Sequence, residues 1–232
     1  MARQQLKGIS LRGNSQTREA SALQTGRMTA AKRRVQIIDV VLRLVDEYGV
    51  QGTTTARIAA AVGVTEPTLY KYFDNRRDML LAALDVVFDR AEDVVRSCQE
   101  DDAVECLRNI GRYHTQATKA RRLGFVNPLF EFTVAPPEVG LRDRVRERSL
   151  VIIDALATMV QRAKNQGGIR QDVDAKRVAW RIMGFYWFED VSTLMDLPEI
   201  VVEGISAEMF DDMLDDIVVA ELREEGHSPI AP

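Results

Sequence analysis

The chain has 232 residues, of which 46% are hydrophobic and 28% are charged, so it is long enough to bury a substantial core. No apolar run approaches the roughly 20 residues that span a bilayer, and the basic N-terminus lacks the apolar block of a signal peptide. Both observations argue against a membrane protein or a secreted one. Cys98 and Cys106 are the only cysteines, so we expect no disulfide framework and a reducing, cytoplasmic location.

The formal net charge of −4 is distributed unevenly along the chain. Residues 1–34 hold eight basic residues against Glu19 alone, a balance of +7 that leaves −11 for the remainder. A basic arm on an acidic body is typical of a protein that meets a polyanion at one end only. A solvated, disordered tail has the same composition, and the two interpretations are compatible.

The first predicted elements are an arm and a helix. Residues 1–28 mix Gly, Ser, Gln and Thr without sustained periodicity, which predicts a flexible basic arm. A helix becomes clear from Thr29, where apolar residues recur at helical spacing until Gly49 provides a stop signal.

Two short helices follow. Thr54 suits the N-cap of a helix over 55–62, because its hydroxyl can accept an unpaired amide of the first turn. Gly63 permits a tight turn, and Thr65 is placed to cap a further short helix that carries Pro67 in its first turn.

The rest of the chain also reads as helical, with no competing alternating pattern of a strand. The expected helices are 76–98, about 101–120, 127–134, about 138–165 after a break at Pro136-Pro137, from Asp172 or Asp174 to about Asp196, and from Ser206 to about Glu224. The long helix over about 138–165 is expected to stop at Gly167-Gly168. We therefore predict an all-α fold, in which a three-helix head over 29–75 is fused by a long helix to a helical domain over 76–226, followed by a frayed tail at 227–232.

Residues 54–73 predict a helix-turn-helix. Two short helices can pack at a steep angle when the contact residue is small and the turn permits positive φ. Ala59, Gly63 and Leu69 meet these requirements, with apolar neighbours at Ile58, Val62, Val64 and Tyr72. A plain helical hairpin is the alternative.

At these residues the sequence resembles the TetR-type repressors. The resemblance covers about residues 31–85 and rests on Gly49, Thr53-Thr54, Ile58-Ala59, Gly63-Val64-Thr65, Thr68-Leu69-Tyr70, Phe73 and Asn75-Arg76-Arg77-Asp78-Met79-Leu80. It implies a homodimer on a palindromic double-stranded DNA operator. It also implies a divergent C-terminal domain in which a ligand changes the separation of the two DNA-binding heads.

The resemblance also implies DNA contacts. Thr54 and Thr55 would lie near a phosphate at the start of the supporting helix. The recognition helix would present Thr65, Glu66, Pro67, Thr68, Tyr70, Lys71 and Tyr72 to bases, groove and backbone. Arg76 stands where the family usually places a phosphate-binding lysine at a helix N-terminus.

Two features depart from the family pattern. Pro67 replaces the glycine that is commonest there, and Glu66 is acidic at a base-facing position, where its carboxylate can accept from cytosine N4. Residues 35–80 hold five basic and six acidic residues, too little positive charge to dominate DNA affinity. Lys32, Arg33 and Arg34 just before the head are the natural reinforcements.

The C-terminal domain is expected to dimerise and to bind a small hydrophobic effector. Apolar stripes on its two long helices predict a dimer interface of Val145, Ile152, Leu156, Met159, Ala179, Ile182 and Tyr186, with Gly184 permitting close approach. Clustered aromatics with a few polar groups predict a pocket lined by Tyr113, His114, Phe125, Asn127, Phe130, Glu131, Trp180, Met183 and Trp187. Ordinary core packing is the alternative for both sets.

Two other classes of function compete with a ligand-released repressor. An enzyme is disfavoured, because the chain has two histidines, one of them in the tail, and no glycine-rich phosphate loop or nucleophile elbow. Cys98 and Cys106 are spaced unlike a zinc site, so we expect no metal, cofactor or catalytic residue. A helical ligand-binding or interaction module without specific DNA binding fits the near-neutral head. The sequence does not identify the operator or the effector, and it does not distinguish a repressor from an activator.

Overall fold

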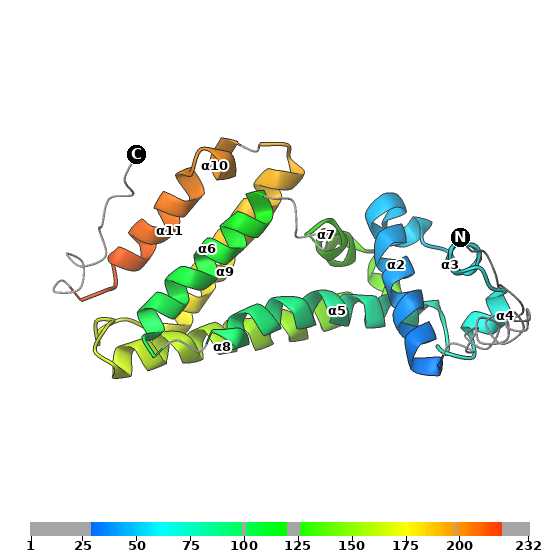
Figure 1. Ribbon diagram of the computed structural model, residues 1–232, viewed down its shortest axis with the longest axis horizontal. Helices are drawn as coiled ribbons and strands as arrows, with labels where there is room; N and C mark the ends of the chain where they lie inside the picture. The colour runs from blue at the N-terminus through cyan, green and yellow to red at the C-terminus, as the bar shows by residue number, and fades with distance from the viewer. Residues whose placement is uncertain (1–28, 99–100, 120–125, 198, 220–232) are drawn as a thin grey trace, which may run out of the picture.

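A computed structural model describes residues 29–98, 101–119, 126–197 and 199–219, and there the chain is all-α, as predicted. The basic arm at 1–28 and the tail at 227–232 lie outside the described residues. The molecule is elongated, with a head at one end made of α2 (Ala30–Gly52), α3 (Thr55–Val62) and α4 (Glu66–Leu69) (Figure 1). The long helix α5 (Arg76–Ser97) leads from this head into the rest of the molecule.

The helix starts of the head follow from side-chain caps. The Thr29 and Thr54 hydroxyls accept from Lys32 N and Arg57 N, and Asn75, which the sequence reading missed, accepts from Asp78 N at the start of α5. Thr65 makes no such cap; its hydroxyl lies 2.9 Å from that of Thr68.

Two glycines of the head adopt positive φ. Gly63 ends α3 at φ 76°, as predicted. Gly49, at φ 67° and ψ 175°, kinks α2 instead of ending it, and one more turn follows to Gly52. The predicted stop is therefore a kink.

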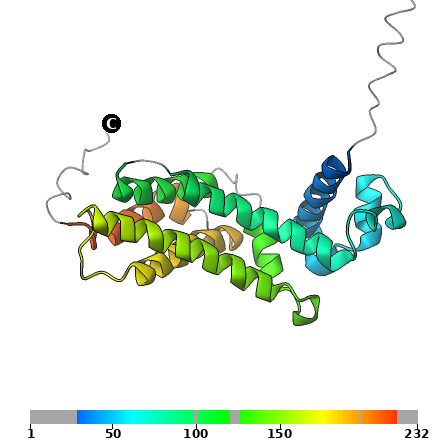
Figure 2. The ribbon, with the colours of Figure 1, turned by 90° about the horizontal axis from the view of Figure 1, so that it is seen from below.

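The remaining helices form the C-terminal domain. They are α6 (Ala103–Lys119), α7 (Val126–Val134), the 3₁₀ turn η1 (Pro137–Val139), α8 (Arg142–Asn165), α9 (Ala175–Leu194), α10 (Glu199–Val202) and α11 (Ile205–Asp215). The views of Figures 1 and 2 both show α8 running alongside α5, with α6, α9 and α11 stacked beyond them and α7 between this stack and the head.

Several helix boundaries differ from the prediction. The helix α8 begins at Arg142 because 137–139 form a 3₁₀ turn that Gly140 ends at φ 69°. The helix α11 ends at Asp215 because the chain beyond it leaves the helix to pair with the segment after α8, with Arg170 N donating to Ile217 O and Val219 N donating to Gly168 O, both at 3.0 Å.

The predicted dimer stripes are the core of a single chain. Ile152, Leu156, Met159, Ala179, Ile182 and Tyr186 are all at most 8% exposed in the isolated chain, and Val145 is half-buried against the same core. The stripes pack within the helical domain, where α8 and α9 lie against each other. The interface prediction for these residues was therefore wrong, since helical periodicity identifies a buried face without identifying what covers it.

The two cysteines also differ from expectation. Cys98 follows α5 and Cys106 lies in the first turns of α6, and the structure joins them as a disulfide with their Cα atoms 5.7 Å apart. A sequence separation of eight residues did not by itself indicate this pairing.

Candidate nucleic-acid interface and internal cavity

The outer surface of the head carries most of the predicted DNA contacts. Pro67, Tyr70 and Lys71 are exposed, and Glu66 and Thr68 are half-exposed beside them on and just after α4. Leu69 of the same helix is fully buried in the head core. The α4 segment therefore presents one polar and aromatic face outward and is held by its apolar face.

The supporting residues lie around this face. Thr54 and Thr65 are exposed at the starts of α3 and α4, and Thr55 is half-buried. Tyr72 is half-buried against the core of the head. Lys32 is exposed on the first turn of α2, where the neighbouring Arg33 guanidinium donates to Gln36 Oε1 at 2.8 Å.

Two arginines predicted to contact phosphate are engaged within the head. Arg34 Nη1 donates to Tyr72 O at 2.6 Å, and its guanidinium lies 4.0 Å from the centre of the Phe73 ring. Arg76 Nε donates to Thr53 O at 2.7 Å and its Nη2 donates to Val50 O, while burial lowers the pKa of this guanidinium. Both side chains fasten α2 and the turn after it to the segments around α5, a role that their position in the sequence did not indicate.

A cavity of about 1120 Å³ lies inside the C-terminal domain, among α5, α6, α7, α8 and α9. Six of the nine predicted ligand residues line it: Tyr113, His114, Phe130, Trp180, Met183 and Trp187. Most of the remaining wall is apolar and includes Val87, Phe88, Val94, Leu129, Val145 and Ile152. A large apolar volume with few polar groups is the usual form of a small-molecule site.

The polar part of the wall is a buried cluster between α6 and α9. Both carboxylate oxygens of Glu189 are paired with α6, since His114 Nδ1 lies 2.6 Å from Oε2 and the Thr115 hydroxyl donates to Oε1 at 2.7 Å. The His114 ring stacks on Tyr186 with the ring centres 4.2 Å apart. Sequence reasoning missed Glu189 and Asp190, because a carboxylate pair on a helix usually marks a solvated face.

Asp190 is the unsatisfied member of this cluster. Its side chain lines the cavity and is 4% exposed, and its Oδ1 lies 3.6 Å from His114 Nε2. Neither Asp190 Oδ1 nor the Tyr186 hydroxyl has a hydrogen-bond partner in the described part of the chain. Burial, with a smaller contribution from Glu189, raises the pKa of Asp190 to about 6 despite the opposing effect of His114.

The three other predicted ligand residues do not line the cavity. Phe125 lies outside the described residues. Asn127 and Glu131 point from α7 to α2: Asn127 Nδ2 donates to Asp46 O and Oδ1, both at 2.9 Å, and Glu131 Oε2 accepts from Val50 N at 3.2 Å. They are polar because they join the two domains, which corrects their assignment to the pocket.

The kink in α2 makes this joint possible. A Cβ on Gly49 would lie 2.6 Å from Glu131 Oε2, and its φ of 67° disfavours any other residue. A second joint lies nearby, where Arg77 of α5 donates to Val139 O at 3.1 Å and to Gly140 O at 2.9 Å.

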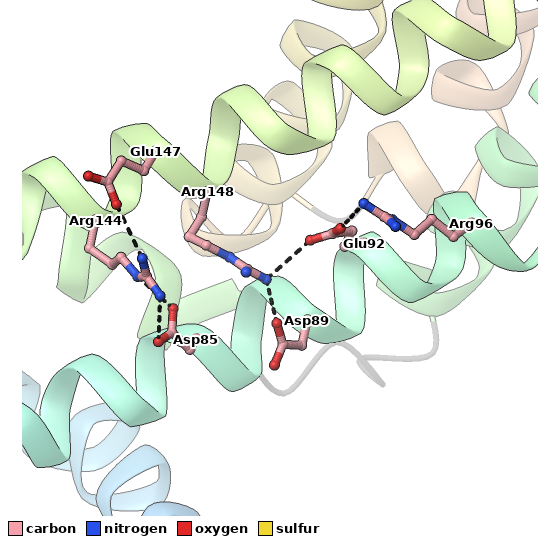
Figure 3. Close-up of polar contacts among 7 residues, drawn as sticks. All are labelled: Asp85, Asp89, Glu92, Arg96, Arg144, Glu147 and Arg148. Atoms are coloured by element: carbon pink, nitrogen blue, oxygen red, sulfur yellow. Dashed lines mark hydrogen bonds and ion pairs between the residues drawn. The ribbon is translucent and has the colours of Figure 1, made fainter.

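Ion pairs fasten α5 to α8 along their shared length (Figure 3). Arg144 of α8 binds both carboxylate oxygens of Asp85, at 2.8 and 3.0 Å, and Arg148 contacts Asp89 and Glu92 of α5. Two-point arginine–carboxylate pairs hold a defined geometry better than single exposed pairs. The helix that carries the head is therefore fixed to one wall of the cavity.

Comparison with known proteins identifies the head. A sequence profile described as "Bacterial regulatory proteins, tetR family" matches residues 37–83, from α2 into α5. Residues 37–83 of the chain therefore form a helix-turn-helix head of the TetR type. The HTH-type transcriptional regulator TtgR of Pseudomonas putida is 32% identical over 84 residues, which are 35% of this chain. The match spans only 40% of TtgR.

Solved structures extend the likeness to the whole fold. A TetR transcription regulator from Haloarcula marismortui shares a TM-score of 0.70 at 19% identity, over 82% of this chain and 100% of the other. FadR from Bacillus subtilis, solved in complex with stearoyl-CoA, shares a TM-score of 0.60 at 20% identity, over 76% and 96%. Identities this low show a shared architecture of head and helical domain.

Among the described residues, no helix is long and apolar enough to cross a membrane. The same residues contain no cluster of three or more His, Cys, Asp or Glu side chains suited to hold a metal ion.

Proposed function

We propose that this chain is a transcriptional regulator of the TetR family, a repressor that binds a palindromic operator as a homodimer and is released by a small hydrophobic molecule in the cavity. The observation that carries the proposal is the position of α7, which has one face in the cavity and the other on the head. Phe130 and Thr133 line the cavity, whereas Asn127 and Glu131 bond to α2. A ligand that moves this one short helix acts on both domains.

Release follows from this coupling if the ligand and operator favour different positions of α7. A ligand shifts an equilibrium only by its difference in affinity for the two states, so the effector must bind more tightly to the arrangement that misplaces the heads. The ion pairs between α5 and α8 make such a change collective, because the head cannot tilt without disturbing them. By linkage, saturating operator then weakens effector binding by the same factor.

The proposed DNA contacts fall into two groups, those to base edges and those to the sugar-phosphate backbone. Glu66, Pro67 and Thr68 face base edges, and Thr54, Thr55, Thr65, Tyr70 and Lys71 position the head on the backbone. Lys32 and Arg33 add positive charge beside this surface. Arg34, Tyr72 and Arg76 serve mainly to hold the surface in shape, since their polar groups are engaged inside the head.

A second copy of the chain is the proposed partner of an exposed apolar stripe on α9. The stripe consists of Trp180, Gly184, Trp187, Phe188, Val191, Leu194 and Met195, which are exposed and recur at helical spacing. Trp180, Trp187 and Val191 lie at its edge and also line the cavity. An exposed stripe of this length on one helix marks an interaction surface. Two copies related by a twofold axis would match two heads to two half-sites, with over about 1,000 Å² buried. A Cβ on Gly184 would meet nothing within 4 Å in the single chain, which leaves room for a close helix–helix approach.

The assembly is tested by light scattering on variants of this stripe. Leu194→Arg and Gly184→Leu should shift the protein to monomer at micromolar concentration and abolish tight operator binding, with unchanged helix content. Met209→Arg is the control, because Met209 is equally exposed but lies on α11. A wild-type monomer, or a dimer indifferent to both stripe variants, would refute this interface.

The regulatory function is tested by selecting bound sequences from a random DNA library with the full chain. We expect a palindrome with half-sites about one helical turn apart. Enrichment of no sequence, with binding that depends only on salt, would instead support a ligand-binding module without specific DNA recognition. Fatty acyl compounds are a comparison class for the effector assay, since FadR from Bacillus subtilis was solved with stearoyl-CoA.

A further inference from the structure

We infer that the effector of this protein carries a positively charged nitrogen, such as a protonated amine, which binds at Asp190 and the Tyr186 hydroxyl in the cavity wall. This inference deepens the proposed function and rests on it, because it takes the cavity to be the effector site. It names the chemical class of ligand that would complete the polar cluster.

The first reason is the contrast between two neighbouring carboxylates. Glu189 is fully buried, but each of its oxygens has a partner on α6, so it serves to fasten α6 to α9. Asp190 is almost as deeply buried and lines the cavity, yet its Oδ1 has no hydrogen bond. A buried carboxylate oxygen without a hydrogen bond is costly, and such atoms in natural proteins usually meet a cation or a donor.

The second reason is that His114 cannot compensate both acids. Its Nδ1 is within hydrogen-bond distance of Glu189, whereas Nε2 is 3.6 Å from Asp190 Oδ1, beyond a hydrogen bond. Even when His114 is protonated, two carboxylates face one positive charge. A ligand cation beside Asp190 would balance the cluster and supply the missing donor.

The third reason is the rest of the wall. The Tyr186 hydroxyl, on a side chain 8% exposed, also lacks a partner and lies one helical turn before Asp190. The rings of Tyr113, Trp180 and Trp187 line the same cavity. Aromatic faces attract cations, and the attraction grows when the site excludes water.

The charged groups at the rim of the cavity favour the alternative class of ligand, an anion. Arg90, Asp93 and Arg146 line the cavity but are exposed, so water screens them. The two arginines could attract an anion such as a fatty acid or the phosphates of an acyl thioester. The buried carboxylate has the stronger influence on what enters the interior, because charge interactions strengthen as water is excluded.

The test compares three probes of equal length: decylammonium, 1-decanol and decanoate. Trp180 and Trp187 are the only tryptophans of the chain and both line the cavity, so intrinsic fluorescence of the full-length protein reports binding. At about pH 7.5 we expect decylammonium to bind on the order of tenfold to a hundredfold more tightly than 1-decanol, as for a hydrogen bond to a charged group. Decanoate should bind most weakly of the three.

Variants locate the preference. Asp190→Asn should remove the advantage of decylammonium over 1-decanol, and Tyr186→Phe should reduce it, while neither should change binding of 1-decanol more than about threefold. Asp212→Asn, an exposed carboxylate of α11 that does not line the cavity, is the matched control and should leave the preference intact. The wild-type comparison needs no variant, so it decides even if a substitution impairs folding.

Failure of this inference is distinguishable from failure of the proposed function. If decanoate or 1-decanol binds at least as tightly as decylammonium and releases operator, the charged-nitrogen inference is wrong and the sensor role stands. If no probe perturbs the tryptophans or operator binding, both fail. An unchanged preference in a folded Asp190→Asn protein would also overturn the inference.

Discussion

Replacing Asp190 by asparagine should stabilise the ligand-free protein at neutral pH. The side chain is 4% exposed, and burial raises its pKa from the ordinary value of 3.8 to about 6. Since a tenfold change in an equilibrium constant is worth about 1.4 kcal/mol, the charged form costs the folded state about 3 kcal/mol at neutral pH. An asparagine amide without a hydrogen-bond partner in the same place is also unfavourable and offsets part of this difference. We therefore expect a net gain of about 1–2 kcal/mol in the free energy of unfolding.

The pH dependence gives the prediction its sign. A carboxyl whose pKa is raised by folding favours the folded state below its unfolded pKa, and that contribution is lost as pH rises through the folded pKa. The advantage of Asp190→Asn should therefore be small near pH 4 and should grow until the pH is above about 6. His114 on α6 and Glu189 on α9 face the same carboxyl, so each variant is compared with wild type at the same pH.

Urea denaturation at several pH values measures the effect, at one fixed protomer concentration because assembly also contributes to stability. Asp93→Asn, an exposed carboxylate on α5, controls for the change in net charge and should alter stability by less than about 0.5 kcal/mol. A stability difference that is flat with pH, or an Asp190→Asn protein less stable than wild type at neutral pH, would show that Asp190 is already satisfied.

Three other substitutions test separate parts of the structure. Gly111→Ala should lower the free energy of unfolding by about 1–3 kcal/mol in the same assay, because its Cβ would lie 2.1 Å from the Phe210 ring; full stability would mean that this contact is loose. Arg76→Ala should lower the free energy of unfolding by a similar amount, because it leaves two backbone carbonyls without their hydrogen bonds. Lys71→Ala should instead keep stability and lower the salt slope of DNA binding by about one. The reverse pattern would show that Arg76 contacts a DNA phosphate. Glu131→Gln should weaken the mutual effect of effector and operator measured by paired titrations, and unchanged coupling would exclude the α7 joint as the route.

Local features of the sequence were enough to predict the head. Thr54 caps α3, Gly63 takes positive φ, and Leu69 returns to the core, as expected from neighbours within a few residues. Caps, turns and helical periodicity depend on short-range geometry, so they can be read from the chain. Six of the nine residues predicted for the pocket also line one cavity, but their meeting there depends on how α6, α7 and α9 pack.

Only the tertiary structure decided what each face meets. The stripe through Ile182 and Tyr186 has the period of an interface and of a core alike, and the packing of α8 against α9 made it core. Arg76 and Glu131 carry groups that suit a phosphate or a ligand, but segments more than twenty residues away supply their hydrogen-bond partners. The raised pKa of Asp190 likewise depends on the tertiary structure. A carboxylate becomes unusual through what surrounds it, and those surroundings come from helices that meet only when the chain is folded.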